Sequence, residues 1–129
     1  MANLLCDKEI DNSKYVAFTL NIKSYPSQLG TTTTNEWKEI FKTEEGLNFL
    51  VSETPNATNY KYFEVDGFPG VIRDYEDYLL GQRTYITNIT VIVNWYFFQL
   101  SLNSLNKELR DKNKELLIQL SDSILFRFW

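Results

Sequence analysis

The stretch from Arg83 to Leu102 constrains the fold more than any other part of the chain. Its sequence, RTYITNITVIVNWYFFQLSL, is rich in β-branched and aromatic residues, which favour strands. It is too long for one strand of ordinary length, which is about five to six residues with a tail to ten. We therefore expect the chain to bend or reverse within it, most plausibly near Asn88 or Asn94.

Shorter strands are predicted in the first half of the chain. Residues 15–22, YVAFTLNI, alternate between apolar and small or polar side chains, which is typical of a half-buried strand. LNFLVSE at 47–53 and YKYFEVD at 60–66 are also predicted to be extended, and GFPG at 67–70 is predicted to turn the chain.

Two helices are predicted, of unequal length. Thr33 and Glu36 match a capping box, and apolar residues follow at helical spacing until Gly46, so a short helix is expected over about 34–45. A longer amphipathic helix is expected over about 104–121, where leucines recur three, four and seven residues apart. A final extended segment, SILFRFW, closes the chain.

This order of elements predicts an α+β fold. At 129 residues the chain fits one domain, residues 1–129. We expect an antiparallel sheet that is covered on one face by a short helix in the N-terminal half and by the longer C-terminal helix.

Composition argues against most catalytic chemistries. The chain contains no histidine, so the commonest general base and zinc ligand are missing. Cys6 is the single cysteine, so no intramolecular disulfide or cysteine metal cluster can form. We therefore expect a protein that is not an enzyme, with no cofactor and no metal. The net charge of −4 also argues against nucleic acid as a partner.

The acidic stretch DYED at 74–77 is the strongest candidate for a site. If residues 81–83 formed a three-residue hairpin loop, Leu80 would lie opposite Thr84. On that register Asp74 and Glu76 lie on a polar sheet face, and Asp77 lies on the other face. The three carboxylates then do not converge. A solvated sheet face is the leading interpretation, a protein-recognition surface is the second, and catalysis or metal binding is the third.

The second half of the chain resembles a known family. GFPGVIRDYEDYLLGQRTYITN, NWYFFQLSLNS, a helix and a closing LSDSILFRF follow the order of elements of the PsbP-like superfamily, with small and aromatic residues such as Gly67, Tyr85 and Phe126. The resemblance covers about residues 60–128. It implies strands that lead to a last helix, and a non-catalytic accessory, assembly or chaperone-like binding role, but it assigns no functional residue.

These observations favour a protein-binding module that acts as an accessory, chaperone-like or partner-neutralising factor. An acidic chain favours a partner with a basic surface. The expected contact residues are acidic: Asp74, Glu76, Glu36, Glu39, Glu44 and Glu45. The alternative is a small-ligand or lipid-binding domain with a pocket between the C-terminal helix and the sheet.

The sequence also suggests a location. MANLLCDKEI lacks the basic start and apolar stretch of a signal peptide, and the longest apolar-rich stretch is interrupted by Asn94 and Gln99. We expect a cytoplasmic protein without a transmembrane segment. It would be secreted or lipid-anchored if a leader had been removed.

Overall fold

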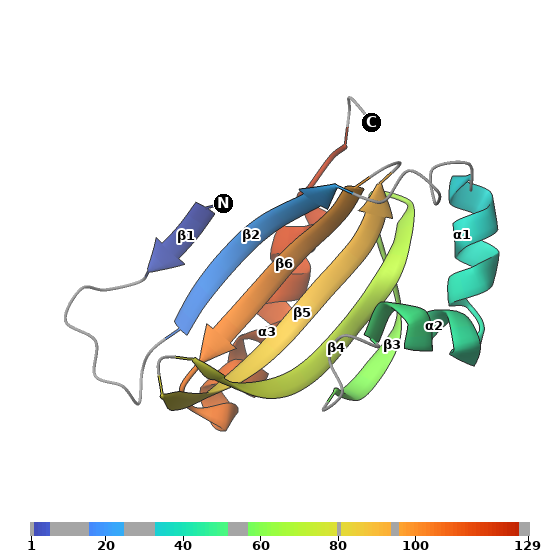
Figure 1. Ribbon diagram of the computed structural model, residues 1–129. Coiled ribbons are helices and arrows are strands. Elements are labelled where there is room, and N and C mark those ends of the chain that lie inside the picture. The colour runs from blue at the N-terminus through green and yellow to red at the C-terminus, as the bar shows by residue number, and fades with distance from the viewer. Residues whose placement is uncertain are drawn as a thin grey trace.

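Six antiparallel strands form one sheet in the computed structural model, which describes residues 2–5, 16–24, 33–51, 57–79, 81–93 and 96–126. Their order across the sheet is β1-β2-β6-β5-β4-β3 (Figure 1). The strands are β1 Ala2–Leu5, β2 Val16–Ser24, β3 Thr58–Val65, β4 Phe68–Leu79, β5 Gln82–Val93 and β6 Tyr96–Ser104. Every pair of neighbouring strands runs antiparallel.

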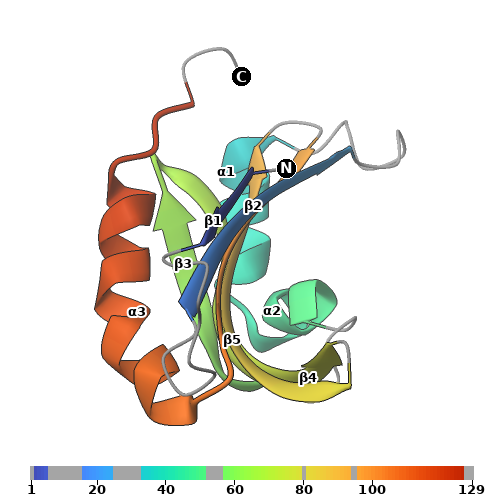
Figure 2. The same cartoon turned by 90° about the vertical axis from the view of Figure 1, so that its left-hand side faces the viewer.

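Among the described residues, three helices lie on the two faces of this sheet. Helix α3, Lys107–Asp122, covers one face, and the short helices α1, Thr34–Phe41, and α2, Glu44–Val51, lie against the other (Figure 2). The predicted α+β class, with an antiparallel sheet, a short helix and a longer C-terminal helix, is confirmed. One part of the prediction is wrong. The short helix and the long helix were expected on the same face of the sheet, but they lie on opposite faces (Figure 2).

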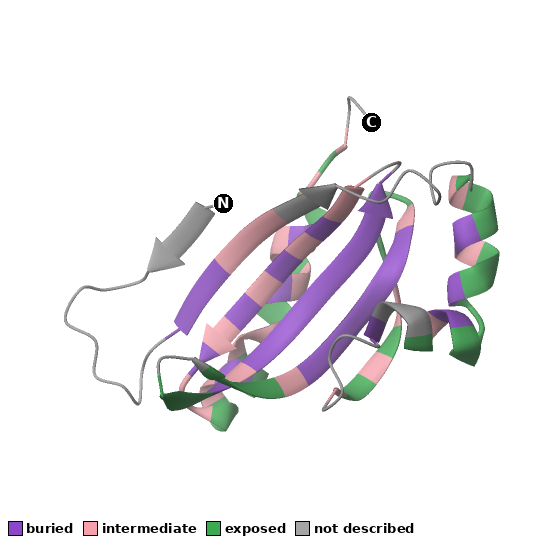
Figure 3. Ribbon diagram, viewed as in Figure 1, coloured by how far each residue is buried: buried purple, intermediate pink, exposed green. Residues whose placement is uncertain are grey.

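The strands at the centre of the sheet explain this difference, because they are apolar on both sides. Ile89 and Val91 of β5 pack with Leu117 of α3. Ile92, which directly follows Val91, points the other way and packs with Trp37 and Phe41 of α1. β5 is therefore buried along most of its length (Figure 3). A strand buried on both faces needs a helix on each side.

The stretch from Arg83 to Leu102 reverses direction near one of the two positions predicted from the sequence. β5 ends at Val93 and β6 begins at Tyr96, and these two residues pair across the strands. The reversal therefore falls near Asn94 and not near Asn88, which lies inside β5. The strands expected at 15–22 and 60–66 are confirmed as β2 and β3. Strand β1 was not predicted.

The capping box at the start of α1 is confirmed. The backbone N–H of Glu36 donates to Thr33 Oγ1 at 3.1 Å, and the Thr33 N–H donates back to the Glu36 carboxylate at 3.2 Å. These two bonds satisfy backbone donors that the first helical turn leaves without partners. The helix begins at Thr34, as the sequence predicts.

The strand predicted at 47–53 is wrong, because most of this segment belongs to α2. The backbone N–H of Gly46 donates to Thr43 Oγ1 at 3.1 Å, and the Leu47 N–H donates to the Thr43 carbonyl at 3.1 Å. Thr43 thus starts a second helix directly after the first. Gly46 does not end a helix. It lies inside α2, where an added Cβ would come within 1.9 Å of the Ile40 carbonyl oxygen of α1.

The turn predicted at 67–70 lies slightly earlier. Asp66 and Gly67 have φ angles of 50° and 79°, and they connect Val65 of β3 to Phe68 of β4. Positive φ at both central residues is the geometry of a two-residue hairpin turn. Phe68 and Pro69 therefore belong to β4.

No helix within the described part of the chain has the length and apolar character needed to cross a lipid bilayer.

Replacing Gly46 with alanine tests the close contact between α1 and α2. We expect Gly46→Ala to lower the free energy of unfolding by about 2 kcal/mol, because the new methyl group must displace the Ile40 carbonyl. Gly67→Ala is the matched control, since it meets no atom within 4 Å and only strains a positive φ. Its cost should be about 1 kcal/mol. Denaturant unfolding measures both values, and a smaller loss for Gly46→Ala than for Gly67→Ala would contradict this contact.

A polar pocket between the C-terminal helix and a hairpin

The register of the β4–β5 hairpin decides where the acidic stretch points. Leu79 pairs with Gln82, and Asp74 pairs with Thr87. The predicted pairing of Leu80 with Thr84 is therefore wrong. The connection contains Gly81 at a φ of 80°, and it is shorter than the three-residue loop that was assumed. The observed register differs from the assumed register by an odd number of residues. The β5 side chains on the same face as Asp74 are therefore those that were expected on the opposite face.

Asp74 is consequently buried under α3 and does not lie on a solvated face. Its side chain is only 3% exposed. Lys114 Nζ of α3 donates to Asp74 Oδ2 at 2.6 Å, and Thr87 Oγ1 of β5 donates to Asp74 Oδ1 at 2.7 Å. Both carboxylate oxygens are thus engaged by groups from two other elements.

The surroundings of Asp74 lower its pKa. Burial favours the neutral acid and acts in the opposite direction, but the hydrogen bonds from Lys114 and Thr87 and the nearby charge of Arg110 outweigh it. The pKa of Asp74 therefore lies below that of an ordinary aspartate. A carboxylate in this state stays charged at neutral pH and is a poor proton donor.

Helix α3 supplies a wall of cations. Lys107, Arg110 and Lys114 follow one another at spacings of three and four residues, which places them on one face of the helix. Arg110 is 4% exposed. Its guanidinium contacts the Asp111 carboxylate at 2.9 Å and donates to the Ile86 carbonyl at 3.4 Å. This buried arginine therefore links the helix to β5.

The end of the β4–β5 hairpin supplies the facing wall. Arg83 donates to the Tyr78 hydroxyl at 3.0 Å, and its guanidinium lies 5.6 Å from the centre of the Tyr78 ring. Arg83 also lies 3.9 Å from the Glu76 carboxylate. Tyr78 itself is 64% exposed. The hairpin thus presents an aromatic ring held by an arginine, with the Glu76 carboxylate beside that arginine.

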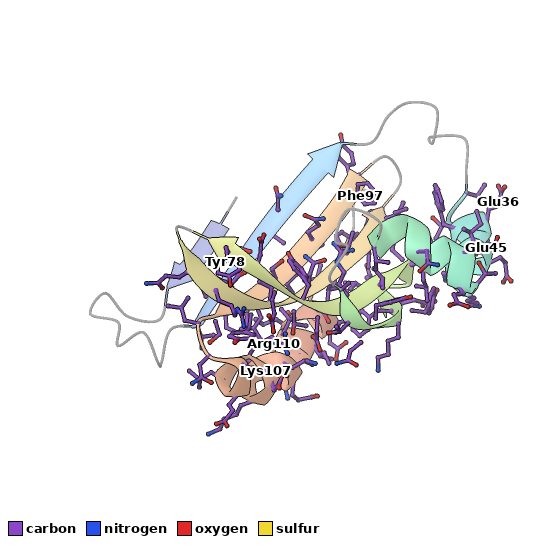
Figure 4. The ribbon with its side chains drawn as sticks, turned by 60° about the horizontal axis from the view of Figure 1, so that its bottom comes forward. Glu36, Glu45, Tyr78, Phe97, Lys107 and Arg110 are labelled. Carbon is purple, nitrogen blue, oxygen red and sulfur yellow. The ribbon has the colours of Figure 1, made fainter. Side chains whose placement is uncertain are left out.

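The two walls enclose an open pocket of about 680 Å³. Figure 4 shows Tyr78 on the hairpin and Lys107 and Arg110 on α3. The lining residues are Thr58, Asn59, Asp74, Tyr75, Glu76, Asp77, Tyr78, Arg83, Lys107, Arg110, Asp111 and Lys114. The pocket lies where the ligand-binding alternative placed one, between the C-terminal helix and the sheet. Its lining is mainly charged and polar, which does not suit a lipid chain.

The other predicted contact residues lie elsewhere. Glu36, Glu39, Glu44 and Glu45 are exposed residues of α1 and α2. Figure 4 shows Glu36 and Glu45 at the opposite end of the molecule from Tyr78 and Lys107. The structure therefore does not bring them together with Asp74 and Glu76. Glu76 is exposed and lies at the pocket, whereas Asp74 forms its floor.

Sequence reasoning missed most of the pocket residues. Lys107, Arg110 and Lys114 were treated as the solvated side of an amphipathic helix, although their spacing alone marks a cationic stripe. Tyr78 and Arg83 were missed because the incorrect register separated them. Cys6, the one cysteine, lies outside the described residues.

Comparisons with known proteins show what this fold is similar to. No protein-family model and no curated protein matches the chain. Among solved structures, the chain is similar to PA94 of Pseudomonas aeruginosa, a protein of unknown function described as a candidate regulator. The TM-score is 0.65 at 8% identity, and the match covers 98% of this chain and 82% of PA94.

The chain is also similar to CyanoP, the cyanobacterial PsbP of Synechocystis. Here the TM-score is 0.52 at 12% identity, over 95% of this chain and 79% of CyanoP. At such identities both likenesses show a shared fold alone. The PsbP-like resemblance inferred for residues 60–128 is thus confirmed for the fold, and it extends to nearly the whole chain.

The ion pair between Asp74 and Lys114 can be tested by a double-mutant cycle. We expect Lys114→Met to lower the free energy of unfolding by about 2 to 3 kcal/mol, because it leaves a buried carboxylate without its cation. Adding Asp74→Asn should recover part of that loss. Glu76→Gln is the control, since its exposed contact with Arg83 is worth at most about 1 kcal/mol. Additive effects of the Asp74 and Lys114 changes would contradict direct pairing.

The coupling should also depend on pH. Because folding lowers the pKa of Asp74, the pair stabilises the fold above the unfolded-state pKa, about 3.9 for aspartate. This stability is lost as the pH falls through the lower pKa of the folded protein. Cycles measured at neutral and at acidic pH should therefore show the coupling shrink in acid.

Proposed function

We propose that this protein is a non-enzymatic accessory module that binds another protein. The observation that carries the proposal is the exposed Tyr78 ring, held by Arg83 at the rim of the pocket. Tyrosine and arginine are enriched among the residues that dominate binding energy at protein interfaces. The likeness to PA94 and CyanoP concerns the fold and adds no function.

The geometry of Tyr78 suits it for this role. A ring that is already held by an arginine loses little conformational freedom when a partner covers it. Its neighbours Glu76 and Arg83 are exposed and charged, so they form a polar rim beside an aromatic centre. An aromatic centre with a polar rim is the usual composition of a protein-binding surface.

The chemistry of the pocket favours binding over catalysis. Its buried carboxylate, Asp74, is held charged by Lys114 and Thr87 and is a poor general acid. The chain has no histidine to take the role of a base. A polar small molecule is the competing occupant, because the pocket lies where that alternative requires it.

A second contact surface is proposed on α1 and α2. Glu39, Glu44 and Glu45 are exposed there, and the chain carries a net charge of −4. Such a surface would speed encounter with a basic partner more than it would raise affinity. The cytoplasmic location and the absence of nucleic acid as a partner also stay predictions.

Affinity capture from native lysate tests the proposal. We expect a partner that is retained by the wild-type protein and largely lost with Tyr78→Ala, because removing a central aromatic costs about 2 kcal/mol or more of binding energy. Leu116→Ala is the matched control, since Leu116 is also an exposed hydrophobic residue and does not line the pocket. The control variant should retain the partner.

Charge reversals on α1 and α2 distinguish the second proposed contact surface from the surface around Tyr78. Loss of the partner with Glu39→Lys and Glu44→Lys, but not with Tyr78→Ala, would move the contact to α1 and α2. A partner that survives both sets of changes would contradict the proposal, as would turnover of a small molecule that depends on Asp74.

A further inference from the structure

The Tyr78 ring needs an anchor, because the residue that holds it is itself exposed. Tyr78 lies near the end of β4, and Arg83 lies directly opposite it on β5. Tyr78 is 64% exposed, and the side chain of Arg83 is 53% exposed. A long exposed side chain such as arginine keeps many rotamers unless other groups fix it. Arg83 can therefore orient Tyr78 only if another residue fixes Arg83.

The ion pair of Arg83 with Glu76 is a weak anchor. Arg83 Nε lies 3.9 Å from Glu76 Oε2, which is too long for a hydrogen bond. The Glu76 side chain is also nearly half exposed. An exposed pair of this kind contributes little, because solvent screens the attraction and both side chains lose conformational freedom when they pair. The guanidinium of Arg83 therefore depends on a further contact.

Tyr85 provides that contact. Arg83, Tyr85 and Thr87 are alternate residues of β5, so their side chains point to the same face of the sheet. This is the face under α3, because Thr87 donates to Asp74, to which α3 also donates. Arg83 donates to the Tyr78 hydroxyl at 3.0 Å, and the Tyr85 hydroxyl is its second side-chain acceptor. The guanidinium is thus held by one tyrosine from each strand of the hairpin.

Helix α3 holds the other side of Tyr85. The guanidinium of Arg110 lies over the Tyr85 ring, 6.0 Å from its centre. Arg110 is buried, and the Asp111 carboxylate and the Ile86 carbonyl fix its position. A cation over an aromatic ring is attracted to it, and the attraction is larger where water is excluded. A continuous series of contacts therefore leads from buried Arg110 through Tyr85 and Arg83 to the exposed ring of Tyr78.

From this series of contacts we propose that Tyr85 is a positioning residue of the protein-binding surface. Its ring packs against Arg110, and its hydroxyl fixes Arg83, which holds the Tyr78 ring in the orientation that the partner meets. Tyr85 does not line the pocket itself. It acts by ordering contact residues before the partner arrives, which lowers the entropic cost of binding. This inference rests on the proposed protein-binding function and names a residue that acts behind that surface.

Removing the Tyr85 hydroxyl tests the inference in the free protein. Tyr85→Phe keeps the ring on Arg110 and deletes only the acceptor for Arg83. Nuclear spin relaxation of isotope-labelled arginine side chains measures the motion of the Arg83 Nε–H group, and we expect its order parameter to fall by roughly a quarter or more. Tyr75→Phe is the matched control. It removes the same hydroxyl from a tyrosine of the same hairpin that lies beside Arg73 on the opposite sheet face, so it should leave Arg83 unchanged.

Binding of the partner that the wild-type protein captures provides the second readout. Tyr85→Phe should weaken this binding by about three- to tenfold, which corresponds to the cost of ordering one long side chain. In an Arg83→Met background, Tyr85→Phe should change the affinity by less than about twofold, because the residue through which Tyr85 acts is missing. A purely structural role of Tyr85 would give the same loss in both backgrounds.

Two results would overturn the inference. One is unchanged motion of the Arg83 side chain in Tyr85→Phe, and the other is an equal loss of affinity with and without Arg83. The proposed function would survive either result if the captured partner still depended on Tyr78. If Tyr78→Ala retained the partner, the proposed function would fail, and the relaxation measurement would still decide whether Tyr85 fixes Arg83.

Discussion

The buried contact of Asp74 with Lys114 and Thr87 is the interaction on which the rest of the site depends. It joins β4, β5 and α3 through one carboxylate. A buried charge is costly unless it is paired and hydrogen-bonded, so this contact specifies how α3 lies on the sheet. With the helix held in that position, Arg110 docks on the Ile86 carbonyl and Lys107 reaches the mouth of the pocket.

The acidic stretch at 74–77 contributes both to the buried contact and to the exposed end of the hairpin. The same stretch that provides the buried carboxylate ends in an exposed hairpin with Tyr78 and Arg83. Charges at the floor are used to hold the fold together. Charges at the mouth, on Lys107 and Glu76, are exposed.

Much of the fold follows from local sequence patterns, and the rest depends on geometry that such patterns do not specify. Alternation predicted β2 and β3, and the capping box predicted the start of α1. The run VIV at 91–93 in β5 is apolar at consecutive positions, which is typical of burial on both faces and explains why the helices lie on opposite sides. The strand expected at 47–53 was wrong because Gly46 was interpreted as a helix end. The site itself depended on the hairpin register, where an odd shift moved Asp74 from solvent to the interior.

The most direct test of this account is the pKa of the Asp74 carboxyl group, measured by NMR titration of its side-chain carbon in the folded protein. The account predicts a value below that of an ordinary aspartate, about 3.9, because Lys114, Thr87 and Arg110 stabilise the charged form. Lys114→Met should raise it. A value near 6 or above in the wild-type protein would contradict the account, since it would describe a carboxyl group poised for acid–base catalysis.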